Sequence, residues 1–200
     1  MVCILVAIKN SQDTSSKMDN RWYYIKHGFP VDLCDYIIDN ATDLQDAQIG
    51  NDGYGRVDKH SRNAQTCFLD RDGMFEQVYH ILYELMGVSN RNMFRTFIYN
   101  INDIQFTKYE KDGIHDWHKD QSRTDDNIIR KISASVQLSN PSDYKGGELQ
   151  FKDQSNCSEF INKGDVLFFP SNQVHRVSTV TEGIRYSLVG WFTGPQFLRG

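Results

Sequence analysis

Ile132-Ser-Ala-Ser-Val-Gln-Leu138 is the stretch of this chain that decides its fold. Its apolar residues (Ile132, Ala134, Val136 and Leu138) alternate with the polar residues Ser133, Ser135 and Gln137. This two-residue period predicts a β-strand that buries one face. Similar short strands are predicted on either side, at residues 94–109, 147–151, 158–161, 166–169, 173–180 and 184–193. Many short strands separated by Gly, Pro and Asn turn signals are typical of a sandwich, barrel or jelly roll.

The first half of the chain has a different pattern. A helix is predicted over residues 31–41, directly after Pro30, and a second over residues 73–86, where Gly87 is expected to end it. The second helix has apolar residues at helical spacing, namely Met74, Val78, Ile81, Leu82 and Leu85. Residues 1–8 are expected to form a strand, residues 10–20 a linker and residues 50–65 a long loop, with a lid as one function for it. Helices followed by strands give the α+β class.

Composition limits the classes of function. The chain has 200 residues and a formal net charge of −4, which argues against a dedicated nucleic-acid-binding protein. No apolar run approaches the 18 or more residues of a membrane helix. The apolar start lacks a basic leader, and the cysteines form no Cys-x-x-Cys pair, so we expect a cytoplasmic protein with reduced thiols.

The sequence offers three candidate ligands for a metal ion: His118, Asp120 and His175. His118 and Asp120 are two positions apart, so on a strand they would share a face. Two imidazoles and one carboxylate occupy one face of a metal ion and leave three positions open, as in non-haem Fe(II) oxygenases. A structural zinc site would instead have four protein ligands.

A fourth residue, Arg185, makes the short His-x-Asp pattern more specific. It lies on the predicted strand after His175, and Ser187 shares its face. Arginine pairs with a carboxylate through two parallel hydrogen bonds, so Arg185 and Ser187 can hold the far end of a dicarboxylic acid whose other end chelates the metal. The surrounding apolar residues predict that this strand is internal rather than at an edge.

These motifs, in this order, resemble the Fe(II)- and 2-oxoglutarate-dependent dioxygenases, in particular the prolyl 4-hydroxylase-like branch and its bacterial PKHD-type hydroxylases. The stretches that carry the resemblance are Tyr109–Asp120, Arg130–Ser139, Tyr144–Phe151, Gly164–Ser171, His175–Val177 and Gly183–Trp191. The resemblance implies a double-stranded β-helix (jelly roll) core at residues 93–195, with residues 1–92 as helical support and lid loop, all within a single domain of residues 1–200.

The resemblance also implies a role for each matching position. His118, Asp120 and His175 match the iron ligands, and Arg185 matches the residue that binds the distal carboxylate of 2-oxoglutarate. The cosubstrate pocket is expected to include Tyr109, Gln137, Leu149, Val177, Ser187 and Trp191. Gln137 departs from the family, where several members have a tyrosine, and His115 stands where many relatives have another aromatic residue. The implied cofactors are Fe(II), 2-oxoglutarate and O₂, with ascorbate as a candidate reductant.

The substrate and two other classes of function stay open. The branch suggests a prolyl residue in a peptide or protein, with release of succinate and CO₂, whereas a free amino acid or another small molecule is the alternative substrate. A jelly roll that binds a ligand without catalysis and a zinc hydrolase on a similar barrel are the other classes. Residues 50–65, with Tyr54, and residues 121–129 are candidate lids. Their basic residues, which are Arg56, Lys59, Arg62 and Arg123, suggest an acidic substrate or simply a solvated surface.

Overall fold

The computed structural model describes residues 21–50, 55–122 and 128–196. The strand predicted at residues 1–8, the linker at 10–20, Tyr54 and Arg123 lie outside the described residues. Within them, no helix is long and apolar enough to cross a membrane.

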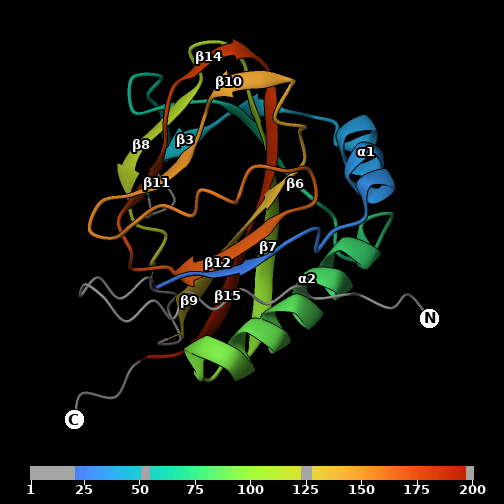
Figure 1. Cartoon of the computed structure of the whole chain (residues 1–200), viewed down its shortest axis with the longest axis vertical. Helices are drawn as coiled ribbons and strands as arrows, with labels where there is room; N and C mark the ends of the chain where they lie inside the picture. The colour runs from blue at the N-terminus through green and yellow to red at the C-terminus, as the bar shows by residue number, and fades with distance from the viewer. Residues whose placement is uncertain (1–20, 51–54, 123–127, 197–200) are drawn as a thin grey trace.

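Two antiparallel sheets form the core (Figure 1). The large sheet has the strand order β1 (Tyr23–Ile25), β12 (Val166–Pro170), β9 (Ile128–Gln137), β15 (Arg185–Pro195), β7 (Asn100–Tyr109), β6 (Gln65–Phe68) and β2 (Gln45–Asp46). The smaller sheet has the order β11 (Leu149–Phe151), β13 (His175–Val177), β8 (Ile114–His118) and β5 (Arg62–Asn63). Two further pairs join β10 (Tyr144–Gly146) to β14 (Val180–Gly183) and β3 (Gln48–Ile49) to β4 (Arg56–Val57). This is the predicted jelly-roll core, and β15 is internal as expected.

Helices α1 (Val31–Asn40) and α2 (Glu76–Ser89) cover one face of the large sheet, and β8 and β11 lie on its other side (Figure 1). The predicted alternation explains this division. In the central parts of β7, β9 and β15, residues of even number, such as Phe106, Val136 and Leu188, join the core that α2 covers with Leu82 and Leu85. Their odd-numbered neighbours face the smaller sheet. Beyond the register shifts the order reverses, so that Ile101 joins the core and Arg130 lines the cavity.

The structure corrects several boundaries of the predicted elements. Gly87 does not end α2, which continues to Ser89 and then into one π-helical turn, Asn90–Phe94. Arg95 has a left-handed backbone with φ 48°, and this ends the helix and delays the start of β7 to Asn100. Met74 precedes the helix and is exposed rather than packed.

Two other predictions assigned the wrong type of secondary structure. Residues 158–161 form turns instead of a strand, because the buried side chains, Cys157 and Phe160, are three positions apart and not two. Residues 50–65 are not one long loop, because β4 and β5 lie within the described part. Both strands are only two residues long, too short for a two-residue period to be visible. The first half of the chain thus contributes strands as well as helices.

One buried carboxylate ties the start of the described chain to the large sheet. Asp165, just before β12, accepts hydrogen bonds from the Tyr24 hydroxyl (3.1 Å) and from the backbone amides of His27 (3.0 Å) and Asn162 (2.9 Å). The side chain of Asp165 is fully buried. Removing it would leave these donors without an acceptor, away from water.

We therefore expect Asp165→Ala to lower the free energy of unfolding by roughly 3 kcal/mol, because several buried donors lose their partner. For a chain of this size, that corresponds to a melting temperature about 6–12 °C lower in a thermal unfolding experiment. The exposed Asp153→Ala is the matched control and should melt like the wild type. Equal melting temperatures for both variants would contradict this role of Asp165.

Candidate metal and cosubstrate site

A cavity of about 1220 Å³ opens between the two sheets. Its inner wall is formed by odd-numbered residues of β7, β9 and β15, including Gln105, Ser135 and Ser187. Nine of the ten residues that the sequence analysis assigned to the metal and cosubstrate site line it: Tyr109, His118, Asp120, Leu149, His175, Val177, Arg185, Ser187 and Trp191. The tenth, Gln137, is buried but does not line the cavity.

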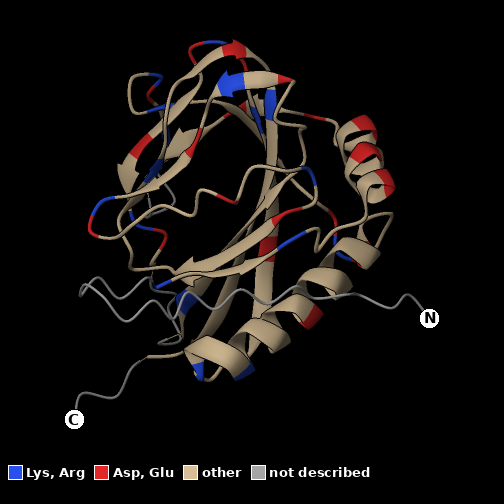
Figure 2. Ribbon diagram, in the orientation of Figure 1, with Lys and Arg blue, Asp and Glu red and all other residues tan. Residues whose placement is uncertain are grey.

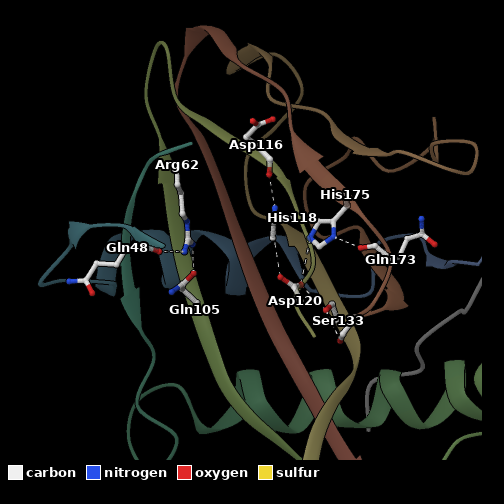
Figure 3. A network of polar contacts seen from close by, with 10 residues as sticks. Gln48, Arg62, Gln105, Asp116, His118, Asp120, Ser133, Gln173 and His175 are labelled. Atoms are coloured by element: carbon white, nitrogen blue, oxygen red, sulfur yellow. Dashed lines mark hydrogen bonds and ion pairs between the residues drawn. The ribbon is translucent and has the colours of Figure 1, made fainter. Parts of the chain in front are cut away.

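His118, Asp120 and His175 meet at one point in this cavity (Figure 3). His118 is the last residue of β8, His175 is the first residue of β13, and the two are direct partners in the register of these strands. Asp120 lies beyond the end of β8, not on the strand as predicted. Its carboxylate nevertheless lies 3.4 Å from His118 Nε2 and 3.6 Å from His175 Nε2. One ligand atom from each residue lies within 4.8 Å of the others, close enough to share a metal ion.

Backbone carbonyls fix the orientation of both imidazoles. His118 Nδ1 contacts the carbonyl oxygen of Asp116 at 2.7 Å, and His175 Nδ1 contacts that of Gln173 at 2.9 Å (Figure 3). A carbonyl only accepts hydrogen bonds, so each Nδ1 must carry a proton. Nε2 of each ring faces Asp120, so it would offer its lone pair to a bound metal ion and can carry a proton towards the carboxylate when no ion is bound. This is the tautomer and orientation that a metal ligand needs.

The third group, Asp120, is held in its charged form. Burial by itself would raise the pKa of this carboxyl, but His175 and His118, together with the hydrogen bond from Ser133 Oγ at 2.7 Å, outweigh it and lower the pKa. Ser133 is in turn 2.9 Å from Ser171 Oγ. Sequence reasoning assigned no role to Ser133, although its place on the polar face of the alternating strand 132–138 was a signal.

Arg185 lies at another part of the cavity wall with only 1% of its surface exposed. Its Nη2 donates to Gln137 Oε1 at 2.6 Å and its Nη1 to Ser187 Oγ at 3.3 Å, while its buried Nε has no partner. The guanidinium also lies 5.5 Å from the centre of the Tyr109 ring. Among the described residues no carboxylate pairs with Arg185. A buried, uncompensated cation is costly, so this pocket is suited to an anion.

Gln137, the residue that departs from the family pattern, lies behind Arg185. Its side-chain amide donates to the Tyr144 hydroxyl through a short hydrogen bond, which leaves the amide oxygen to accept from Arg185. Gln137 therefore orients the guanidinium. Tyr144 comes from β10, and sequence reasoning gave no reason to connect these residues.

The ring of His115 stacks on the ring of His118, with the centroids 3.6 Å apart and the planes 16° apart. This stacking defines a flat wall beside the three candidate ligands. On another wall, the guanidinium of Arg130 lies 4.0 Å from the centre of the Trp191 ring. Both contacts restrict side chains that border the cavity.

Residues 104–193 match the family model of the 2OG-Fe(II) oxygenase superfamily. This match spans 90 of the chain's 200 residues. The matched segment includes all three candidate metal ligands and Arg185. It also includes both long central strands, β9 and most of β15, whose odd-numbered residues line the cavity.

Curated proteins that are similar to part of this chain include PKHD-type hydroxylases. One from Idiomarina loihiensis is 34% identical over 89 residues, which cover 44% of this chain and 40% of that relative. Another, from Psychrobacter sp., is 43% identical over 61 residues, which cover 30% of this chain and 24% of the relative. The aligned parts thus span less than half the length of these curated relatives.

Solved structures show the same fold as this chain. The viral collagen prolyl hydroxylase of Paramecium bursaria Chlorella virus-1 has a TM-score of 0.67 at 20% identity and covers 88% of this chain and 97% of its own. A Pseudomonas putida prolyl-4-hydroxylase has a TM-score of 0.66 at 22% identity, with 88% and 94% covered. At these identities the likeness concerns the fold alone.

We expect Asp120→Ala to weaken the binding of Mn(II), a redox-stable substitute for Fe(II), by roughly 100-fold or more, because losing even an outer-shell partner costs 10–100-fold. Isothermal titration calorimetry measures this affinity. The control is Asp116→Ala, which removes an exposed carboxylate but keeps the backbone carbonyl that holds His118. Mn(II) affinity that is equal in the Asp120 variant and the wild type would refute the ligand assignment.

Proposed function

We propose that this chain is an Fe(II)- and 2-oxoglutarate-dependent dioxygenase that hydroxylates an unactivated C–H bond, with a prolyl residue of a peptide or protein as its substrate and succinate and CO₂ as its other products. The observation that carries this proposal is the presence, in one cavity, of a two-histidine, one-carboxylate group and a buried arginine without an anionic partner.

The donor set suits Fe(II), since two imidazole nitrogens and one carboxylate would hold the ion and leave room for further ligands. Bound Fe(II), with 2-oxoglutarate and O₂, supplies the oxidising power that no side chain has. The chain itself holds and orients. Arg185 and Ser187 would bind the distal carboxylate of 2-oxoglutarate, with Gln137 keeping the guanidinium in place. The apolar side chains of Leu149, Val177 and Trp191 would exclude water from the reacting end.

The prolyl substrate is supported by the relatives. The sequence relatives are named PKHD-type hydroxylases, and the structural neighbours include prolyl hydroxylases. One of these neighbours, from Trichoplax adhaerens, was solved in complex with a peptide fragment and has a TM-score of 0.67 at 14% identity. A peptide substrate is therefore preferred over a free amino acid. The intact set of ligands and Arg185 favour an enzyme over a binding module without catalysis.

The direct test is the conversion of 2-oxoglutarate to succinate with Fe(II), O₂ and ascorbate present. We expect the wild type to form succinate, and His175→Ala to form none above background while keeping its circular dichroism spectrum, because one of three ligands is lost and the core is unchanged. A wild type that binds Mn(II) and 2-oxoglutarate but forms no succinate, with or without prolyl peptides, would favour the binding module.

A second test concerns Arg185 and needs no turnover. In the Mn(II)-loaded protein, we expect Arg185→Ala to raise the Kd of 2-oxoglutarate roughly 30-fold or more, since truncating one partner of a buried charge pair costs at least 2 kcal/mol. Titration calorimetry with 2-oxobutyrate, which lacks the distal carboxylate, provides the control ligand and should show little change. If the two ligands lose affinity equally, Arg185 supports the site as a whole instead of binding that carboxylate.

A further inference from the structure

Three basic residues follow one another between residues 56 and 62, and the structure separates them into two kinds. Arg56 lies 3.6 Å from Asp58, and Lys59 lies 3.0 Å from Asp46, with 76% and 60% of their side chains exposed. They form ordinary surface ion pairs. Arg62, by contrast, lines the same cavity as the three candidate metal ligands.

The contacts of Arg62 leave its charge uncompensated. Its Nη2 donates to Gln105 Oε1 at 2.6 Å and its Nη1 to the backbone oxygen of Gln48 at 3.1 Å (Figure 3). Its Nε is buried and has no hydrogen-bond partner. The two acceptors are neutral, and no carboxylate among the described residues forms an ion pair with Arg62. Such a guanidinium is held in position while part of its donor capacity stays free.

Arg62 lies beside the candidate metal ligands, and its hydrogen-bond partners differ from those of Arg185. On β5 it is the direct strand partner of His115, whose ring stacks on the candidate ligand His118. Gln105, which holds Arg62, and Tyr109, which is the strand partner of Arg185, are both on β7. These two positions are four residues apart, or about 13 Å along the strand, and the charges of both arginines act on the Tyr109 hydroxyl between them. One cavity therefore contains two guanidiniums that are held by different partners.

The remaining charges give this cavity two unlike ends. The part that reaches α1 is lined by the carboxylates of Asp39, Asp43 and Asp70, while Asp46 is paired with Lys59. The row of acidic residues on α1 is visible in Figure 2. Near the metal ligands, Arg62, Arg130 and Arg185 outnumber the carboxylate of Asp120. An anionic group of a ligand would therefore be attracted to the metal end and repelled from the α1 end.

We propose that Arg62 binds a carboxylate of the primary substrate, so that the preferred substrate is a peptide with a glutamate or aspartate close to the residue that is hydroxylated. This inference rests on the proposed dioxygenase function. Arg62 would fix the position of the peptide beside His115, while Arg185 remains available to 2-oxoglutarate. A free acid could offer the same carboxylate chemistry, and the experiment separates the two sources.

The experiment uses blocked hexapeptides with a central proline and either glutamate or glutamine at each flanking position. Peptide-stimulated succinate formation and calorimetric binding to the Mn(II)- and 2-oxoglutarate-loaded protein are measured in parallel. We expect the wild type to bind the best glutamate peptide roughly 10-fold or more tightly than its glutamine analogue, as a charge-assisted hydrogen bond would give. Arg62→Gln should remove this difference, whereas Arg56→Gln should keep it.

A charge-reversal variant distinguishes the loss of the carboxylate site from misfolding of the protein. Arg62→Glu should prefer peptides with lysine at the same position over those with glutamate, which an unfolded variant cannot do. Equal binding of glutamate and glutamine peptides by a wild type that forms succinate would overturn the proposal and leave the dioxygenase function standing. A preference that persists in Arg62→Gln would also overturn it. Arg62-dependent binding of free proline or another free acid, with no binding of the blocked peptides, would support the carboxylate site but overturn the peptide source.

Discussion

The two-residue alternation along β7, β9 and β15 is the constraint on which the rest of this structure depends. One set of residues, including Phe106, Val136 and Leu188, packs under the helices, and the set between them faces the cavity. Core and site are thus opposite faces of the same three strands. A shift of one residue in the register would bury the polar set and open the apolar set to the cavity. Hydrophobic burial therefore also determines where the functional side chains point.

The cavity has an unusual feature, since two arginines that line it, one from each sheet, have only neutral hydrogen-bond partners among the described residues. Gln137 and Ser187 hold Arg185, and Gln105 and the Gln48 carbonyl hold Arg62. A buried cation without a counter-ion destabilises a folded protein, and this applies most to Arg185, which is almost fully buried. This arrangement is understandable in a protein whose ligands bring the missing negative charge.

Sequence reasoning found what periodicity and spacing encode. The alternation at 132–138 located β9, and the spacing of His118, Asp120 and His175 identified residues that the fold brings together. It failed where contacts between residues that are far apart in sequence determine the structure. The link from Tyr144 to Gln137 joins separate strands, and α2 continues past Gly87 because tertiary packing outweighs one glycine's weak helix propensity. Likewise, nothing in the composition of residues 56–62 distinguishes the inward Arg62 from its solvated neighbours.

The direct pairing of His118 with His175 has a consequence for the energetics of the smaller sheet. These residues are far apart in sequence, and their rings meet only when β8 and β13 are paired. An ion held between them therefore binds the closed sheet and not the opened one. By linkage, it would stabilise that pairing by about 2.7 kcal/mol at a free concentration 100 times its Kd. Amide hydrogen exchange would then slow in β8 and β13 more than in α1. The bound ion would thus hold together the smaller sheet, whose strands are the shorter ones.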